Sequence, residues 1–216
     1  MTVLNTVHGR WVHTRRVRVL AERIHPLIED GWQVADVGAG DGSFGARLLE
    51  RVPGLRMVGY DVLVRPHTAI PVIPMEGGRL PLADGAVDAV LLVDVLHHAD
   101  DPLELLREAA RVARRAIVIK DHRTARPLAR ATLRFMDRVG NRRHGVALPC
   151  NYWSDARWQA AWSELRLTLE HYQTRLGLYP RPAKWLFEDG LHFLARLRPR
   201  TQDDSLSNCI PRAAAA

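Results

Sequence analysis

A glycine-rich turn between an apolar strand and a helix constrains this chain more than any other part of its sequence. Residues 34–45 read VADVGAGDGSFG, so small and β-branched residues lead into three glycines before a helical pattern begins. Glycine allows positive φ angles and close approach of a ligand, and the N–H groups at a helix start can receive an anionic group. The G-x-G-x-G spacing is shorter than the G-x-G-x-x-G dinucleotide fingerprint. A dinucleotide is therefore not the first expectation, and a plain tight turn stays an alternative.

Two later segments extend this pattern. The strand-like run Leu55–Tyr60 ends at Asp61, about 20 residues past the glycines, where an acidic residue can accept hydrogen bonds from ribose hydroxyls. A surface aspartate at a strand end is the alternative. The apolar run Ala89–Val93 favours a buried parallel strand, and a helix is predicted from about Pro102 to Ala113. Alternating strands and helices predict a parallel sheet with helices on both faces.

With these segments in place, the chain resembles the class I S-adenosylmethionine-dependent methyltransferases. The resemblance is to the small-molecule, methyltransferase type 11-like branch, which has an L-P-[FL]-x-[DN] segment and an L-H-H turn. The matching segments are VADVGAGDGSFG, GYD, EGGRLPLADGAVDAVLLVDVLHH and RAIVIKD, which together cover roughly residues 33–121. The resemblance implies an α/β, Rossmann-like, doubly wound and mostly parallel seven-stranded sheet with an antiparallel edge strand. It also implies methyl transfer from S-adenosylmethionine, with S-adenosylhomocysteine as product, to a small-molecule acceptor. An anionic or lipid-like acceptor is a further expectation, which comes from the basic helix described below.

The resemblance also places the cofactor along the carboxyl ends of the strands. Its methionine end is expected over the glycines, with Asp36 ordering the turn, and its ribose on Asp61. Glu76 stands near the adenine amino group, where most members of the family have aspartate. The predicted cofactor-binding residues are Asp36, Gly38, Ala39, Gly40, Gly42, Asp61, Val62, Glu76, Gly77 and Asp94.

The acceptor site is predicted from residue type and position. A general base is needed only if the acceptor must lose a proton, and the candidates are His98, His122 and Tyr152. Asp121 and His122 end the predicted fifth strand and are expected to face the reacting centre. The segment 121–162 is predicted to form a lid over the acceptor, with an ordinary packed connection as the alternative.

The domain prediction is one methyltransferase domain over residues 1–198. It begins with an amphipathic helix over 12–30, for which Val12 is one of the apolar positions and Gly31 the stop. Strands are expected over Leu165–Gln173 and Leu191–Leu197. Residues 199–216 are predicted to be a disordered tail.

The net positive charge of the chain lies in residues 121–216. Residues 1–120 hold 15 basic and 15 acidic residues, whereas residues 121–216 hold 16 and 9, so the entire net charge of +7 lies there. A helix with two stripes is predicted: a basic one of Arg126, Arg130, Arg134 and Arg138, and an apolar, core-facing one of Leu128, Ala131, Phe135 and Val139. Such a helix suits an anionic membrane surface or the guidance of anionic substrates. A solvated face is the alternative, since arginine outnumbers lysine 29 to 2 and indicates compositional bias.

Several other classes are disfavoured. No apolar run approaches a membrane span and no signal-peptide pattern begins the chain; together with only two cysteines, Cys150 and Cys209, this predicts a cytoplasmic protein. No metal is predicted, because His97–His98 with Asp100–Asp101 are interpreted as turn and helix-cap residues.

Two alternative functions stay open. A nucleic-acid methyltransferase fits the isoelectric point of about 10.2, although the tetrapeptides N-P-P-Y and D-P-P-Y are absent after the fourth strand. A non-catalytic partner protein with the same fold is the other. Oligomeric state is not predicted.

Overall fold

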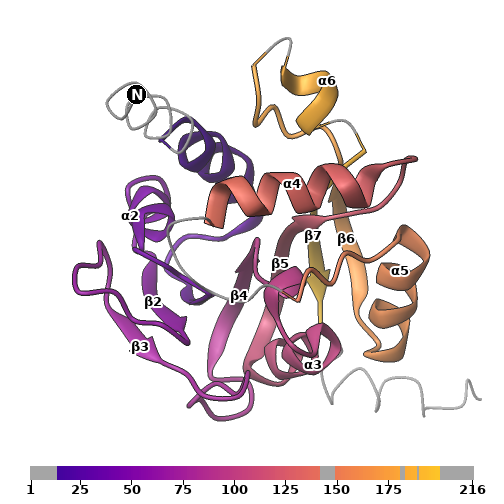
Figure 1. Ribbon diagram of the computed structural model, residues 1–216. Coiled ribbons are helices and arrows are strands. Elements are labelled where there is room, and N and C mark those ends of the chain that lie inside the picture. The colour runs from indigo at the N-terminus through magenta and orange to yellow at the C-terminus, as the bar shows by residue number, and fades with distance from the viewer. Residues whose placement is uncertain (1–13, 142–148, 181–182, 189, 200–216) are drawn as a thin grey trace, which may run out of the picture.

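The centre of the molecule is a seven-stranded β-sheet with helices on both faces (Figure 1). The computed structural model describes residues 14–141, 149–180, 183–188 and 190–199. The strands are β1 (Gln33–Val37), β2 (Arg56–Asp61), β3 (Val72–Pro74), β4 (Val87–Val93), β5 (Ala113–His122), β6 (Thr168–Gln173) and β7 (His192–Arg198).

The strand order is β3-β2-β1-β4-β5-β7-β6. The pairs from β3 through β5 are parallel, and β7 is antiparallel to both β5 and β6. This confirms the predicted doubly wound, mostly parallel sheet with antiparallel pairing at one edge. The order reverses between β1 and β4, so the carboxyl ends of these strands border the crevice in which open α/β sheets bind ligands.

The helices divide between the two faces of the sheet. They are a helix over residues 14–24, η1 (His25–Leu27), α2 (Ser43–Leu49), η2 (Leu96–His98), α3 (Pro102–Val112), α4 (Ala129–Asn141), α5 (Asp155–Glu164) and α6 (Ala183–Phe187). The first helix and α2 pack on one face, and α3 and α5 on the other. β4 has no polar face because Leu92 is buried in one core and Leu91 in the other. This explains its continuous apolar run.

The N-terminal helix is shorter than predicted. Its α-helical part ends at Ile24, and a 3-10 turn over His25–Leu27 follows. Pro26 has no N–H for a helical hydrogen bond, and this ends the α-helix before the predicted residue 30. The predicted apolar position Val12 lies outside the described residues, as do residues 142–148 of the predicted lid and 200–216 of the predicted tail.

The predicted apolar stripe of α4 is wrong. The helix begins at Ala129, after Leu128, which has a φ of 62°. Ala131 and Phe135, like Leu128, are exposed. The buried positions are Ala129, Leu133 and Asp137. The prediction failed because the side of the helix that faces the protein carries Asp137, whose buried carboxylate finds polar partners there, and not the residues of the predicted stripe.

The arginines of α4 face solvent as expected. Arg130, Arg134 and Arg138 are exposed, whereas Arg126 precedes the helix and is half-buried. Among the described residues, no helix is long and apolar enough to cross a membrane.

Candidate active site

The glycine turn joins the end of β1 to the start of α2. Gly38, Gly40 and Gly42 have φ angles of 70°, 60° and 71°, which favour glycine over residues with a Cβ. At Gly38 a Cβ would also stand 2.3 Å from Cγ2 of Val95, the residue two positions after β4. The turn therefore requires glycine both for its conformation and for its close approach to the β4 side of the crevice.

Asp61 holds this turn in place from the end of β2. Its Oδ2 accepts a 2.8 Å hydrogen bond from the N–H of Gly40, and its Oδ1 accepts a 2.9 Å bond from Leu63. Each carboxylate oxygen can accept more than one hydrogen bond, so both can still receive a ligand hydroxyl.

The predicted adenine side of the crevice lies next to Asp61. The N–H of Met75 donates to the carbonyl of Asp61 at 3.0 Å, which brings the turn containing Glu76 and Gly77 beside the end of β2. Val62 leaves 71% of its surface exposed, an apolar side chain directly after the acidic residue. An exposed apolar surface beside a carboxylate fits a nucleoside, with a ring on one side and a ribose on the other.

Asp36 has a buried carboxyl group, and one of its oxygens accepts no hydrogen bond from the described residues. It is 2% exposed, and its Oδ2 has no hydrogen-bond partner among the described residues. Burial, together with the charge of Asp61, raises the pKa of Asp36 to about 7. A cationic ligand group beside Oδ2 would satisfy this oxygen and favour the ionised form.

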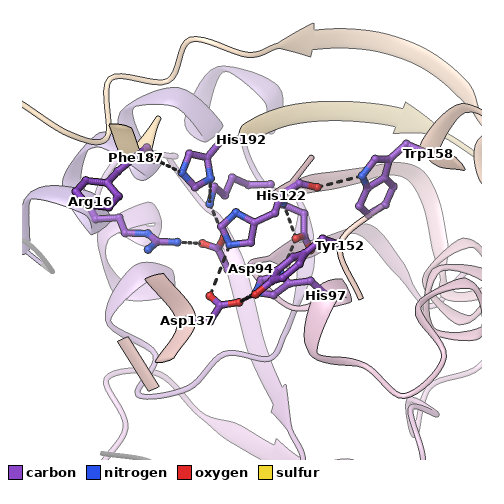
Figure 2. Close-up of polar contacts among 11 residues, drawn as sticks. Arg16, Asp94, His97, His122, Asp137, Tyr152, Trp158, Phe187 and His192 are labelled. Carbon is purple, nitrogen blue, oxygen red and sulfur yellow. Dashed lines mark hydrogen bonds and ion pairs between the residues drawn. The ribbon is translucent and has the colours of Figure 1, made fainter. Parts of the chain in front are cut away.

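Asp94, at the end of β4, is already engaged by two cations. Its carboxylate pairs with Arg16 of the N-terminal helix and with the fully buried Lys120 of β5 (Figure 2). Burial alone would raise the pKa of Asp94, but the charges of Arg16 and Lys120 hold it well below its usual range. The nitrogen Nδ1 of His192, on β7, lies 3.3 Å from Nζ of Lys120. Direct contact of Asp94 with a cofactor stays a prediction.

A second polar cluster surrounds His97, on the side where the acceptor is predicted. Its Nδ1 lies 2.6 Å from Oδ1 of Asp121, and its Nε2 lies 3.7 Å from Oδ2 of Asp137. The hydroxyl of Tyr152 donates to Asp137 (Figure 2). Burial would lower the pKa of His97, but the charge and hydrogen bond of Asp121 outweigh burial and raise it. The two carboxylates beside this ring therefore favour its protonated form more than water does.

The structure brings the three predicted catalytic residues to this cluster. The ring of Tyr152 is 5.9 Å from that of His122 and 5.8 Å from that of His97, and the rings of His97 and His98 are 3.8 Å apart. Two backbone hydrogen bonds pin the Tyr152 segment over the strand ends, from Asn151 N–H to the carbonyl of His97 and from Thr124 N–H to that of Trp153.

The directions of the pKa shifts indicate different roles for the residues of this cluster. Burial and the neighbouring His97 lower the pKa of His98 to about 4 and that of His122 well below its usual range, so both rings are neutral at pH 7. Burial and the bond to Asp137 raise the pKa of Tyr152, which therefore keeps its proton. The neutral histidines can accept a hydrogen bond, although their lowered pKa values make them weak proton acceptors, whereas Tyr152 acts as a donor.

His97 and Asp137 are the central residues that the sequence reasoning missed. His97 was visible only as half of a His-His pair, and Asp137 only as one polar residue in a basic helix. The ligand atoms of His97, His98 and Asp137 lie within 4.8 Å of one another, a spacing that a metal ion could bridge. Hydrogen bonds to Asp121 and Tyr152 already account for two of these side chains, and Asp101, as predicted, caps α3. The absence of a metal stays a prediction.

Known proteins share this sequence pattern and fold. A methyltransferase-domain family model matches residues 35–117. Uncharacterized methyltransferases from Mycobacterium sp. strains JLS and KMS are 34% and 35% identical over 113 residues, which cover 44% of this chain and 44% of each relative. The chain thus spans less than half the length of the curated relatives it matches.

Solved structures extend the likeness to nearly the whole chain. A chain of the Haloferax volcanii complex between the Trm112 methyltransferase activator and a methyltransferase has a TM-score of 0.66 at 15% identity, over 90% of this chain and 94% of that one. Burkholderia thailandensis 1,6-didemethyltoxoflavin-N1-methyltransferase has a TM-score of 0.62 at 16% identity, over 91% and 84%. At these identities the likeness shows the fold. Together with the family match over the glycine turn and the next strands, it confirms the resemblance predicted from sequence, which is to the class I S-adenosylmethionine-dependent methyltransferases.

Proposed function

We propose that this chain transfers a methyl group from S-adenosylmethionine to a small-molecule acceptor bound against the His97 cluster. One observation carries the proposal. The glycine turn with Asp61 and the buried cluster of His97, His122 and Tyr152 lie at the same carboxyl edge of the sheet, on the two sides of the point where strand order reverses. A donor on one side and an acceptor on the other would then meet at the centre of that edge.

The residues around the turn fit the cofactor. The unpartnered Oδ2 of Asp36 suits the cationic end of the methionine part, Asp61 suits the ribose, and Val62 suits one face of the adenine. Glu76 and Gly77 would stand at the adenine edge, as predicted. The bound cofactor supplies a methyl group that is already activated on sulfur, so the protein chiefly has to align the acceptor and exclude water.

The acceptor cluster supplies orientation and a place for a proton. His122 and His98 are neutral and can accept a hydrogen bond from an acceptor hydroxyl or amine. Asp121 fixes the ring of His97, and Asp137 fixes the hydroxyl of Tyr152. These bonds hold the walls of the site in one geometry, which is what positioning requires.

Two structural neighbours favour a small acceptor. The Burkholderia thailandensis protein acts on 1,6-didemethyltoxoflavin, and another neighbour is a geranyl diphosphate methyltransferase, with a TM-score of 0.61 at 14% identity. The Haloferax volcanii neighbour is in a complex with an activator, so dependence on a protein partner is an outcome for the experiment to reveal. A cytoplasmic location, and contact of the basic second half with an anionic membrane, stay predictions.

Calorimetry with S-adenosylmethionine and S-adenosylhomocysteine tests the cofactor assignment. Changing Asp61→Ala removes the acceptor for two ribose hydroxyls and releases the N–H of Gly40. Affinity should fall on the order of tenfold to a hundredfold, since hydrogen bonds to charged groups contribute roughly 1.5–3 kcal/mol. Asp30→Ala is the matched control, because this exposed aspartate precedes β1 at the opposite edge of the sheet. Unchanged affinity in a folded Asp61→Ala protein would remove the assignment.

Methyl transfer is then measured with methyl-labelled cofactor and separate pools of small metabolites, lipids and RNA. Label in a small metabolite or lipid supports the proposal. Label in RNA identifies a nucleic-acid methyltransferase instead, and cofactor binding with no transfer to any pool favours the non-catalytic partner protein.

A further inference from the structure

Large apolar side chains are exposed where α4 and α6 meet. Leu128, just before α4, is 81% exposed and Phe135, on α4, is 58% exposed; Trp185 and Leu186, on α6, are 66% and 54% exposed. The two helices lie together on one side of the molecule (Figure 1), and Arg126 joins them by donating a 2.5 Å hydrogen bond to the carbonyl of Leu186. Exposed large apolar residues on two neighbouring helices are a feature of interaction surfaces.

Cations without acidic partners accompany these side chains. Arg130, Arg134 and Arg138 recur every four residues on the exposed side of α4, and none forms an ion pair with another described residue. Surface arginines elsewhere in the described chain are often paired, as Arg47 is with Glu50 and Arg107 with Glu104. We define the α4–α6 surface as Leu128, Arg130, Arg134, Phe135, Arg138, Trp185 and Leu186.

A basic groove adjoins this surface. It has a volume of about 430 Å³ and is lined by Arg123, Thr174, Arg175, Lys184 and Gly190. Lys184 belongs to α6, the helix that also carries Trp185 and Leu186, so the groove and the apolar side chains share this helix. Arg123 pairs with Asp155, whereas Arg175 and Lys184 have no acidic partner among the described residues. An anionic group in the groove would supply the missing negative charge.

We propose that the α4–α6 surface docks on an anionic lipid bilayer. Arginines beside exposed tryptophan, phenylalanine and leucine match a membrane interface, where cations meet lipid phosphates and apolar side chains enter the headgroup region. The groove is placed to hold one anionic headgroup. A second copy of the chain fits less well, because a symmetric contact would bring the arginines of α4 against their counterparts. Nucleic acid would match the charge but would leave Leu128 and Trp185 without apolar partners.

The docking surface and the proposed acceptor site share helix α4. On α4 the exposed arginines flank the buried Asp137, which contacts Tyr152 and His97; Arg134 lies three residues before Asp137, on a neighbouring position of the helix surface. Resting on the proposed function, this arrangement assigns the acceptor to membrane lipids or to molecules dissolved in the bilayer. Docking itself needs neither cofactor nor acceptor, so it can be tested separately.

Cosedimentation with vesicles, without cofactor, tests the docking. One set is phosphatidylcholine alone and the other contains roughly one-third phosphatidylserine. The protein should sediment with the anionic set only, and added salt should weaken this binding. The triple variant Arg130→Gln, Arg134→Gln, Arg138→Gln should weaken binding at least about tenfold. The pair Trp185→Ser and Leu186→Ser should weaken binding while leaving its salt dependence in place.

A charge-matched control separates this surface from net charge. The variant Arg47→Gln, Arg107→Gln, Arg114→Gln removes the same charge from exposed positions elsewhere and should bind nearly as the parent does. Equal loss in the control, no binding to anionic vesicles, or a dimer that only the α4–α6 variants abolish would overturn the proposal. Thermal unfolding establishes that each variant is folded. A failed cofactor titration with intact vesicle binding would remove the methyltransferase assignment alone.

Discussion

The cofactor side and the acceptor side of the crevice are built in different ways. On the cofactor side, the chain places Asp36, Gly38 and Gly40 within five consecutive residues and needs one distant carboxylate, Asp61, to hold them. On the acceptor side, at the ends of β4 and β5, Asp94 gathers Arg16 from 78 positions away and Lys120 from 26, and it is also a predicted cofactor contact. Backbone conformation dominates the first region and buried charge the second, so the two should respond to different substitutions.

The largest effect is expected at Asp94. Changing Asp94→Ala leaves Arg16 and Lys120 without their shared anion in a buried site. Breaking a buried ion pair in this way costs roughly 3–5 kcal/mol. Urea unfolding should show this loss, whereas Asp84→Ala, which breaks the exposed pair with Arg111, should hardly change the free energy of unfolding. Similar losses of unfolding free energy in both variants would contradict the view that buried charges hold the acceptor side together.

Gly38→Ala should produce the next largest loss of stability. This loss would show that backbone conformation determines the structure of the cofactor side. The new Cβ would meet Val95 in a left-handed conformation that itself costs about 1–3 kcal/mol. Cofactor affinity should fall with stability. Gly31→Ala is the control: its φ is 75°, nothing lies within 4 Å of the new Cβ and it is not a predicted site residue, so only about 1 kcal/mol is expected. Equal effects at both glycines would show that packing against Val95 is unimportant.

His122→Ala should separate the two sides functionally. Removing this neutral imidazole should lower turnover on the order of 10²-fold, the lower range for a general base, and leave cofactor affinity unchanged. Turnover and calorimetry on the same preparation check this. A large loss of cofactor affinity would place His122 on the cofactor side and contradict the division.

The smallest expected effect is a pH dependence from Asp36. Its pKa is about 7 in the folded protein and lies near 3.8 when unperturbed, so between these values the folded state binds more protons than the unfolded state. Its contribution to stability therefore falls as pH rises through that window. Between pH 5 and pH 8, the free energy of unfolding should fall by about 1–3 kcal/mol less in Asp36→Asn than in the parent protein. Urea unfolding at both pH values measures this difference.

Cofactor binding should show the opposite trend with pH. The ionised form of Asp36 suits a cationic group, so affinity should increase as pH rises through about 7 in the parent and not in Asp36→Asn. Parallel titration curves for the two proteins would exclude Asp36 from the cofactor site.

The sequence by itself determined most of the sheet and the glycine turn of the predicted cofactor side. Three features follow from requirements that are met within a few residues of the chain. The glycines at 38, 40 and 42 meet the need for positive φ angles, and the acidic residue at 61 stands at a strand end. The continuous apolar run over β4 meets the need for burial on both faces. Such local requirements leave a pattern in the chain, and the predicted positions agree with the observed strands to within a few residues.

Only the tertiary structure decided the acceptor side and the orientation of α4. Asp137 looks like a solvated residue in a basic helix, but it is buried against Tyr152 and His97, and Arg16 looks like one of many arginines until it meets Asp94. The physical reason is desolvation. A buried charge is tolerated where a partner of opposite charge or a hydrogen-bond donor meets it, and the partners come from elements far apart in the chain. Packing selects which of the many charged residues those are.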